Sequence, residues 1–278
     1  MTDDRTAKTV RVLATANAVL WTALGVGWYS AKGWALALWP WPEVPMTFVF
    51  LASIAASIAA SIAVVWAAIA WTGELAALSG VGLNIVVAGA GTGAHLLTVN
   101  LVASAVWAFA GVAFGVLLFA WARRQPVHDT RAMPPLVRGA FVAFTVTLIV
   151  AGGALSLQQQ VFPWHLHPSS MMLIGANFLG AAVYFAHAAA HPRWAYAAPP
   201  LWGFLAYDLI LFVPYLRMLS AGSAAVDDYY GDGGGSVNMT SLSVYLSVLG
   251  ASTALALYYL LVHPSTRLVR RRADLRAP

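Results

Sequence analysis

The chain has 278 residues, of which 60% are hydrophobic and only 9% are charged. A soluble globular domain carries roughly 25% charged residues, and so few charges cannot cover a protein of this size in water. The composition excludes a cytosolic enzyme and indicates an integral membrane protein, and the lack of cysteine excludes disulfides and thiolate metal sites.

About eight stretches of the chain are long and apolar enough to cross a bilayer as helices. In chain order they are Val10–Tyr29, Pro45–Trp71, Leu75–Leu97, Asn100–Trp121, Val137–Leu157, Pro168–His191, Ala195–Leu219 and Ser241–Val262. Helices are expected because these runs are continuously apolar, whereas the strands of a membrane barrel alternate polar and apolar residues. We therefore predict an all-α polytopic membrane protein.

The Lys and Arg residues fall mainly on one side of this topology. All but Lys32 and Arg217 lie before or in the first turn of the first span, after the last span, between the sixth and seventh, or between the fourth span and the first turn of the fifth. Because loops rich in Lys and Arg are retained in the cytoplasm, both termini are predicted to be cytoplasmic. The membrane is predicted to be a bacterial cytoplasmic membrane. The basic tail 265–278 is an orientation signal or a site for anionic lipids, so the basic balance requires no nucleic acid.

Two related segments indicate an internal duplication. Residues 39–45 (WPWPEVP) and 162–168 (FPWHLHP) both read aromatic-Pro-Trp-x-x-x-Pro, at a constant offset of 123 positions. Each segment precedes a predicted span. We therefore predict two parallel four-helix repeats, 1–124 and 138–264, joined by a cytoplasmic linker at 125–137 and related by a pseudo-twofold axis along the membrane normal.

The aromatic residues of these two loops have two interpretations. Trp39, Trp41, Phe162 and Trp164 either rest in the headgroup region as interface anchors, or fold inward as a paired gate over a central cavity. Anchoring is the simpler of the two, because tryptophan is enriched at membrane interfaces.

Small residues predict where helices pack closely. Ser53 and Ser57 of the second span, with Ala176 and Gly180 at the matching positions of the sixth, form stripes suited to a seam between helices. The third span holds several glycines, among them Gly82 and Gly91. These permit close packing or an unwound segment that lines a cavity.

Asp208 is the main functional candidate. It lies near the middle of the seventh span, where a charged carboxylate costs several kcal/mol unless it is paired, hydrated or protonated. It marks a proton or solute site, or else makes a structural hydrogen bond that fixes helix packing. The expected partners are Tyr207, Asn84, Asn177 and Asn17.

Three histidines form a weaker candidate for a metal site. His187 and His191 share one face at the cytoplasmic end of the sixth span, and His263 lies at the same depth on the eighth. Three imidazoles can bind a divalent metal, although no carboxylate completes the set as in a zinc protease. The sequence requires no cofactor and leaves the identity of any cofactor open.

Three classes of function fit these features. A transporter or channel-like protein for a small solute or ion agrees with the duplication and the midplane acid. A non-catalytic membrane subunit that anchors or stabilises a larger complex agrees with the short cytoplasmic loops; a homodimer is the alternative assembly. An intramembrane lipid-processing enzyme ranks last, because no diphosphate-binding acid motif or Ser/His dyad appears, so we expect no enzymatic activity.

Overall fold

The computed structural model describes residues 4–39, 41–72, 75–98, 101–221 and 237–267. Over these residues the regular structure is helical, with no β-strand. Five helical stretches are long and apolar enough to cross a membrane: Ser104–Ala122, Pro135–Ser156, Pro168–Ala190, Trp194–Ser220 and Met239–Val262. The chain is therefore a helical, multi-pass membrane protein, as its composition predicts.

The helices follow the predicted segments in order. They are α1 (Asp4–Tyr29), α2 (Gly33–Leu36), α3 (Pro45–Thr72), α4 (Leu78–Leu96), α5 (Leu101–Val106), η1 (Trp107–Val112), α6 (Ala113–Ala122), α7 (Pro135–Ser156), α8 (Pro168–Ala190), α9 (Trp194–Ala221), α11 (Met239–Leu257) and η3 (Tyr258–Val262). The two η segments are π-helical turns that continue α5 into α6 and extend α11. A helix thus lies over each predicted segment, while the number of membrane spans remains a prediction.

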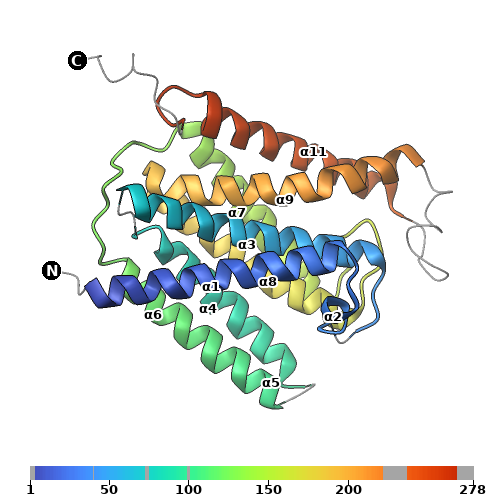
Figure 1. Ribbon diagram of the computed structural model, residues 1–278. Helices are drawn as coiled ribbons and strands as arrows, with labels where there is room; N and C mark the ends of the chain where they lie inside the picture. Colours follow the sequence, from blue (N-terminus) through green and yellow to red (C-terminus); the bar gives the residue numbers. More distant parts are fainter. Residues whose placement is uncertain (1–3, 40, 73–74, 99–100, 222–236, 268–278) are drawn as a thin grey trace.

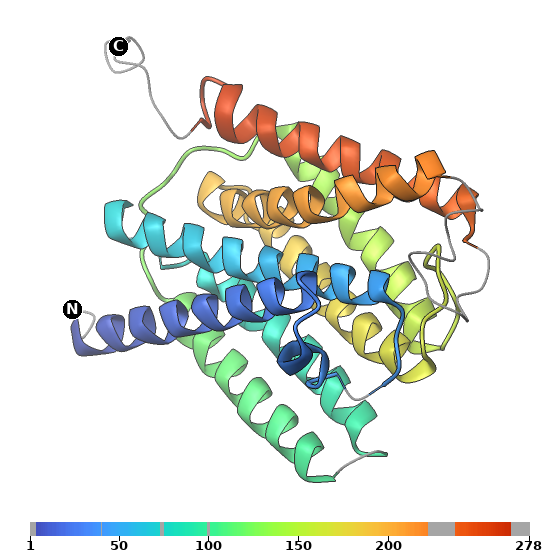
Figure 2. The same ribbon diagram turned by 45° about the vertical axis from the view of Figure 1, so that its right-hand side comes forward.

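The long helices form two rows that face each other (Figures 1 and 2). In the first row α1 packs on α3, α3 on α9, and α9 on α11. In the second row the continuous helix α5–η1–α6 packs on α4, α4 on α8, and α8 on α7. A smaller contact between α8 and α9 joins the rows.

Glycines bring the helices of the second row close together. A Cβ atom on Gly82 of α4 would lie 2.7 Å from the backbone N of Phe119 in α6, and one on Gly91 would lie 2.7 Å from Cβ of Ala176 in α8. Helix α4 is continuous, so its glycines serve close packing, and the alternative of an unwound segment is wrong. Ala176 and Gly180 lie in the predicted seam, because Gly180 packs directly against Asn84.

The basic connections meet at one end of the bundle. Ala132, before α7, forms an antiparallel bridge with Arg193, before α9. Arg131 pairs with Asp129 at 2.6 Å and donates from Nη1 to the carbonyl oxygen of Ser265 at 3.2 Å. Helix α1 begins at the same end, and the two Pro-Trp loops lie at the opposite end (Figure 1). The predicted lipid-binding tail lies outside the described residues beyond position 267.

Candidate functional site

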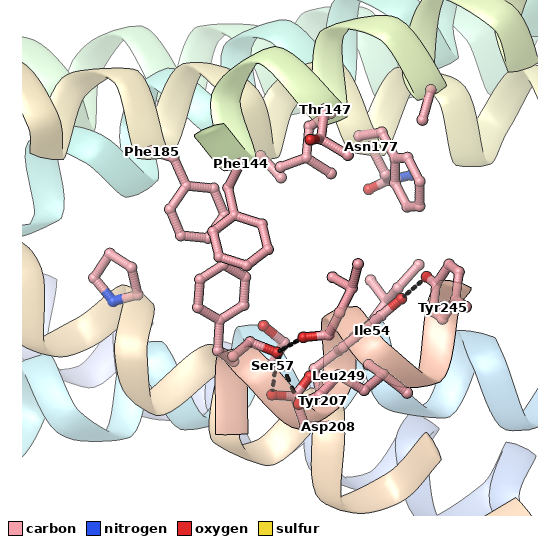
Figure 3. Close-up of a pocket in the computed structure, with 18 of the residues that line it drawn as sticks. Ile54, Ser57, Phe144, Thr147, Asn177, Phe185, Tyr207, Asp208, Tyr245 and Leu249 are labelled. Atoms are coloured by element: carbon pink, nitrogen blue, oxygen red, sulfur yellow. Dashed lines mark hydrogen bonds between the residues drawn. The ribbon is translucent and has the colours of Figure 1, made fainter. Parts of the chain in front are cut away.

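A pocket of about 460 Å³ lies between the two rows (Figure 3). It is lined by α3, α4, α7, α8, α9 and α11, together with loop residues Val161 and Phe162. Its wall includes all four residues predicted for a proton or solute site: Asn84, Asn177, Tyr207 and Asp208. The volume lies within the range of about 300–1,000 Å³ that is typical of small-molecule sites.

Asp208 lies near the midpoint of α9 and is only 1% exposed. Its Oδ2 atom accepts hydrogen bonds from Ser252 Oγ at 2.7 Å and Thr253 Oγ1 at 3.0 Å, both on α11. Ser252 Oγ also lies 2.9 Å from the carbonyl oxygen of Val248. Because a hydroxyl carries one proton, Ser252 can donate to only one of these two acceptors at a time.

The expected partners of Asp208 are therefore wrong. The Asn177 amide donates within its own helix, to the Leu173 carbonyl oxygen at 2.9 Å, and Asn17 on α1 does not line the pocket. The hydroxyl of Tyr207 hydrogen-bonds that of Tyr245 instead. The missed partners were visible in the sequence as a Ser-Thr pair inside the last apolar segment.

No basic side chain compensates the charge of Asp208 in the described part of the chain. The ion pair recorded there joins Arg131 to Asp129 at the basic end of the bundle. Arg217 follows Asp208 by nine positions on α9, a rise of about 13 Å along the helix axis. Among the described residues the carboxyl group is thus stabilised by neutral hydroxyl donors, and protonation, hydration or a positively charged ligand are the ways in which its charge can be accommodated.

Aromatic side chains form both ends of the pocket. Toward the basic end, the ring of Phe204 lies 4.4 Å from that of Phe144 and 4.5 Å from that of Phe185, which connects α9 to α7 and α8. Toward the Pro-Trp end, the ring of Phe162 lies 6.0 Å from Phe178 and 6.1 Å from Tyr245. Figure 3 shows Phe144 and Phe185 on one side of the cavity and Tyr245 on the other, with Asp208 between them.

The Pro-Trp loops fold inward. Phe162 and Trp164 are 4% and 2% exposed, so the interpretation as headgroup anchors is wrong for both. Trp164 Nε1 donates to Thr47 Oγ1 in α3, and Trp39 Nε1 donates to Ser170 Oγ in α8, each at 3.2 Å.

Two residues of the first Pro-Trp loop remain. Trp41 is partly buried, and its ring stacks on that of His167 with 6.4 Å between the ring centres. Pro40 lies outside the described residues. Of the four residues predicted for a paired gate, Phe162 lines the pocket, whereas Trp39, Trp41 and Trp164 do not, so the gate stays a prediction.

The three candidate metal-binding histidines do not form one cluster. The rings of His187 and His191 lie 4.3 Å apart, and Nε2 of His187 lies 2.8 Å from Ser79 Oγ. His263 instead lies against Tyr259, at 4.9 Å between rings. Within the described ranges no group of three or more His, Cys, Asp or Glu side chains is placed to hold a metal ion.

The pocket thus combines one acidic group, two amides and several hydroxyls with apolar and aromatic walls. Such a site can bind a small amphipathic molecule and can exchange a proton at the carboxyl group. No protein-family model, curated protein or solved structure matches the chain.

Proposed function

We propose that the chain is a transporter or channel-like protein for a small solute or ion, with the interior pocket as its solute site. The observation that carries this proposal is the position of Asp208. It is a single acidic side chain, 1% exposed, at the middle of a membrane helix and on the wall of a pocket of about 460 Å³. Ionisable groups at membrane depth mark solute or proton pathways, and carriers bind their solutes near the midplane, between repeats.

The proposed architecture is eight spans in two four-helix repeats. The offset of 123 positions relates α1 to α7, α3 to α8 and α4 to α9, and by chain order α5–η1–α6 corresponds to α11. Under this correspondence the contacts α1–α3, α3–α9 and α9–α11 of the first row become α7–α8, α8–α4 and α4–α6 of the second. Equivalent contacts in both rows support a pseudo-twofold axis between them.

Individual residues follow the same offset. Thr47 and Ser170, which accept the two tryptophan hydrogen bonds, occupy equivalent positions in the two halves. Asn84 of α4 corresponds to Tyr207 of α9, and both line the pocket. The proposed solute site therefore lies at the interface of the two repeats, where both halves contribute to its wall.

The transport proposal is tested in proteoliposomes that contain the pH dye pyranine. Small cationic, anionic and uncharged aromatic solutes are added one at a time under an imposed pH gradient. We expect at least one solute to change the lumenal pH with the native protein and not with empty liposomes, and Asp208→Asn to abolish the change. The matched control is Asp129→Asn, the same substitution in the α6–α7 connection, which should leave the flux unchanged.

Two results would count against transport. If no solute moves protons, or if Asp208→Asn retains the full flux, the proposed role of the carboxylate is wrong. A stoichiometric protein that co-purifies in mild detergent, combined with no flux, would instead favour the role of a membrane subunit.

A further inference from the structure

We infer that the solute of this pocket is a lipophilic cation, an aromatic or aliphatic molecule with one positive charge, which enters from the bilayer between α7 and α11. This inference rests on the proposed role of the pocket as the solute site. It follows from the charge of the wall, from its aromatic side chains and from the side on which the pocket opens.

The charge of the wall favours a cation. The described residues that line the pocket include one acid, Asp208, and no Lys, Arg or His. An anionic solute would place a second negative charge beside the carboxylate in a medium of low dielectric constant, where repulsion is strong. A cation instead supplies the charge partner that the surrounding helices do not provide, since the two hydrogen bonds to Oδ2 come from neutral hydroxyls.

The aromatic side chains favour the same class of solute. Phe144, Phe178, Phe185, Phe204 and Tyr245 all line the pocket. Aromatic rings attract a cation that lies against their faces, more strongly where water is excluded. The remaining walls are mainly aliphatic, so they suit the apolar body of the molecule.

The pocket opens on the membrane-facing surface. Val244 and Val248, one turn apart on α11, line the pocket and are still 60% and 40% exposed, and Thr147 on α7 is also both lining and exposed. Helix α7 packs on α8 and α11 packs on α9, with the pocket between these two pairs. Both α7 and α11 belong to stretches apolar enough to span a membrane. The opening therefore faces hydrocarbon, and a solute that uses it must dissolve in lipid.

The experiment measures binding of tetraphenylphosphonium to the full chain in lipid nanodiscs, with an ion-selective electrode and empty nanodiscs as the blank. We expect saturable binding at one site per chain. Tetraphenylborate, which has nearly the same shape and the opposite charge, should show no saturable binding in a separate titration. Asp208→Asn should weaken binding about tenfold or more, because it removes the charge partner, while Asp129→Asn should not.

A second pair of variants tests the route of entry. Val244→Trp enlarges a side chain at the opening, whereas Val262→Trp makes the same change at a residue of similar exposure, 59%, that does not line the pocket. We expect Val244→Trp to slow association several-fold and Val262→Trp to leave it unchanged. Both positions are exposed, so this pair remains informative even where Asp208→Asn does not fold.

The outcomes separate this inference from the transport proposal. Binding of tetraphenylphosphonium without proton movement in proteoliposomes would retain the solute class and reject proton-coupled transport. Proton movement with other solutes, combined with no saturable binding of tetraphenylphosphonium, would retain transport and overturn the solute class. Equal binding of tetraphenylborate, or unchanged binding by Asp208→Asn, would also overturn the inference.

Discussion

The substitution Gly82→Ala tests the close contact between α4 and α6, on which the second row depends. The new Cβ atom would lie 2.7 Å from the backbone N of Phe119 and 2.8 Å from the carbonyl oxygen of Gly115, where ordinary contact begins near 3.4 Å. Both neighbours are backbone atoms, so no side chain can rotate away. The two helices must therefore move apart until this shortest contact lengthens from 2.7 Å to about 3.4 Å.

A separation of this size is costly because α4 and α6 are held together by dispersion contacts in lipid. A gap of about 0.5–1 Å forfeits a quarter to a half of each contact, and overpacking typically costs about 1–3 kcal/mol. The intrinsic helix preference of alanine over glycine returns up to about 1 kcal/mol. We expect the free energy of unfolding to fall by about 1–2 kcal/mol.

The control is Gly153→Ala in α7, where a Cβ atom would meet nothing within 4 Å. It should be neutral or stabilising by up to about 1 kcal/mol. Unfolding in mixed micelles is followed by tryptophan fluorescence, since the chain contains 12 tryptophans. If Gly82→Ala matches Gly153→Ala within about 0.5 kcal/mol, the backbones of α4 and α6 do not touch in the membrane, and the proposed symmetry loses the α4–α6 contact that matches α9–α11.

Two further predictions concern the loops and the orientation. Trp39→Phe removes the donor to the fully buried Ser170 hydroxyl on α8, and it should lower the free energy of unfolding by about 1–3 kcal/mol. Trp34→Phe, at a residue that is 55% exposed, should change the free energy of unfolding little. Equal effects of the two variants would reject the buried hydrogen bond. The chain has no cysteine, so a single introduced cysteine is the one thiol that a maleimide can label. A membrane-impermeant maleimide should label Thr98→Cys on intact cells and Lys8→Cys only after permeabilisation. The reverse pattern would contradict cytoplasmic termini.

The sequence predicts the helices well because continuous apolar runs have one stable form in lipid. It also predicts that Asp208 matters, since a buried charge is costly wherever it lies in a span. Its partners depend on which helices become neighbours, which local patterns do not encode. Ser252 and Thr253 reach the carboxylate only because α11 packs on α9.

The Pro-Trp loops illustrate the same limit. A tryptophan beside a helix end is typical of a membrane interface, and the same residue can be buried wherever another segment covers it. Trp164 is buried because its indole meets Thr47, more than a hundred positions away in the sequence. Trp39 likewise donates to Ser170 of α8, so each Pro-Trp loop contacts the helix that follows the other loop.

The pocket departs from the proposed symmetry in an informative way. Its wall includes α7 and α11 from the second half. The described residues of α1, the proposed counterpart of α7, and of α6, part of the proposed counterpart of α11, do not line it. Under the proposed repeat, the position equivalent to Asp208 is Ile85, an apolar residue that packs against the cluster containing Leu78 and Leu118 and does not line the pocket. The proposed repeat therefore adds no second acid to the pocket wall, and the described lining residues hold one carboxyl group. Under the two proposals above, this one carboxyl group would pair with one cation per chain, next to the opening between α7 and α11.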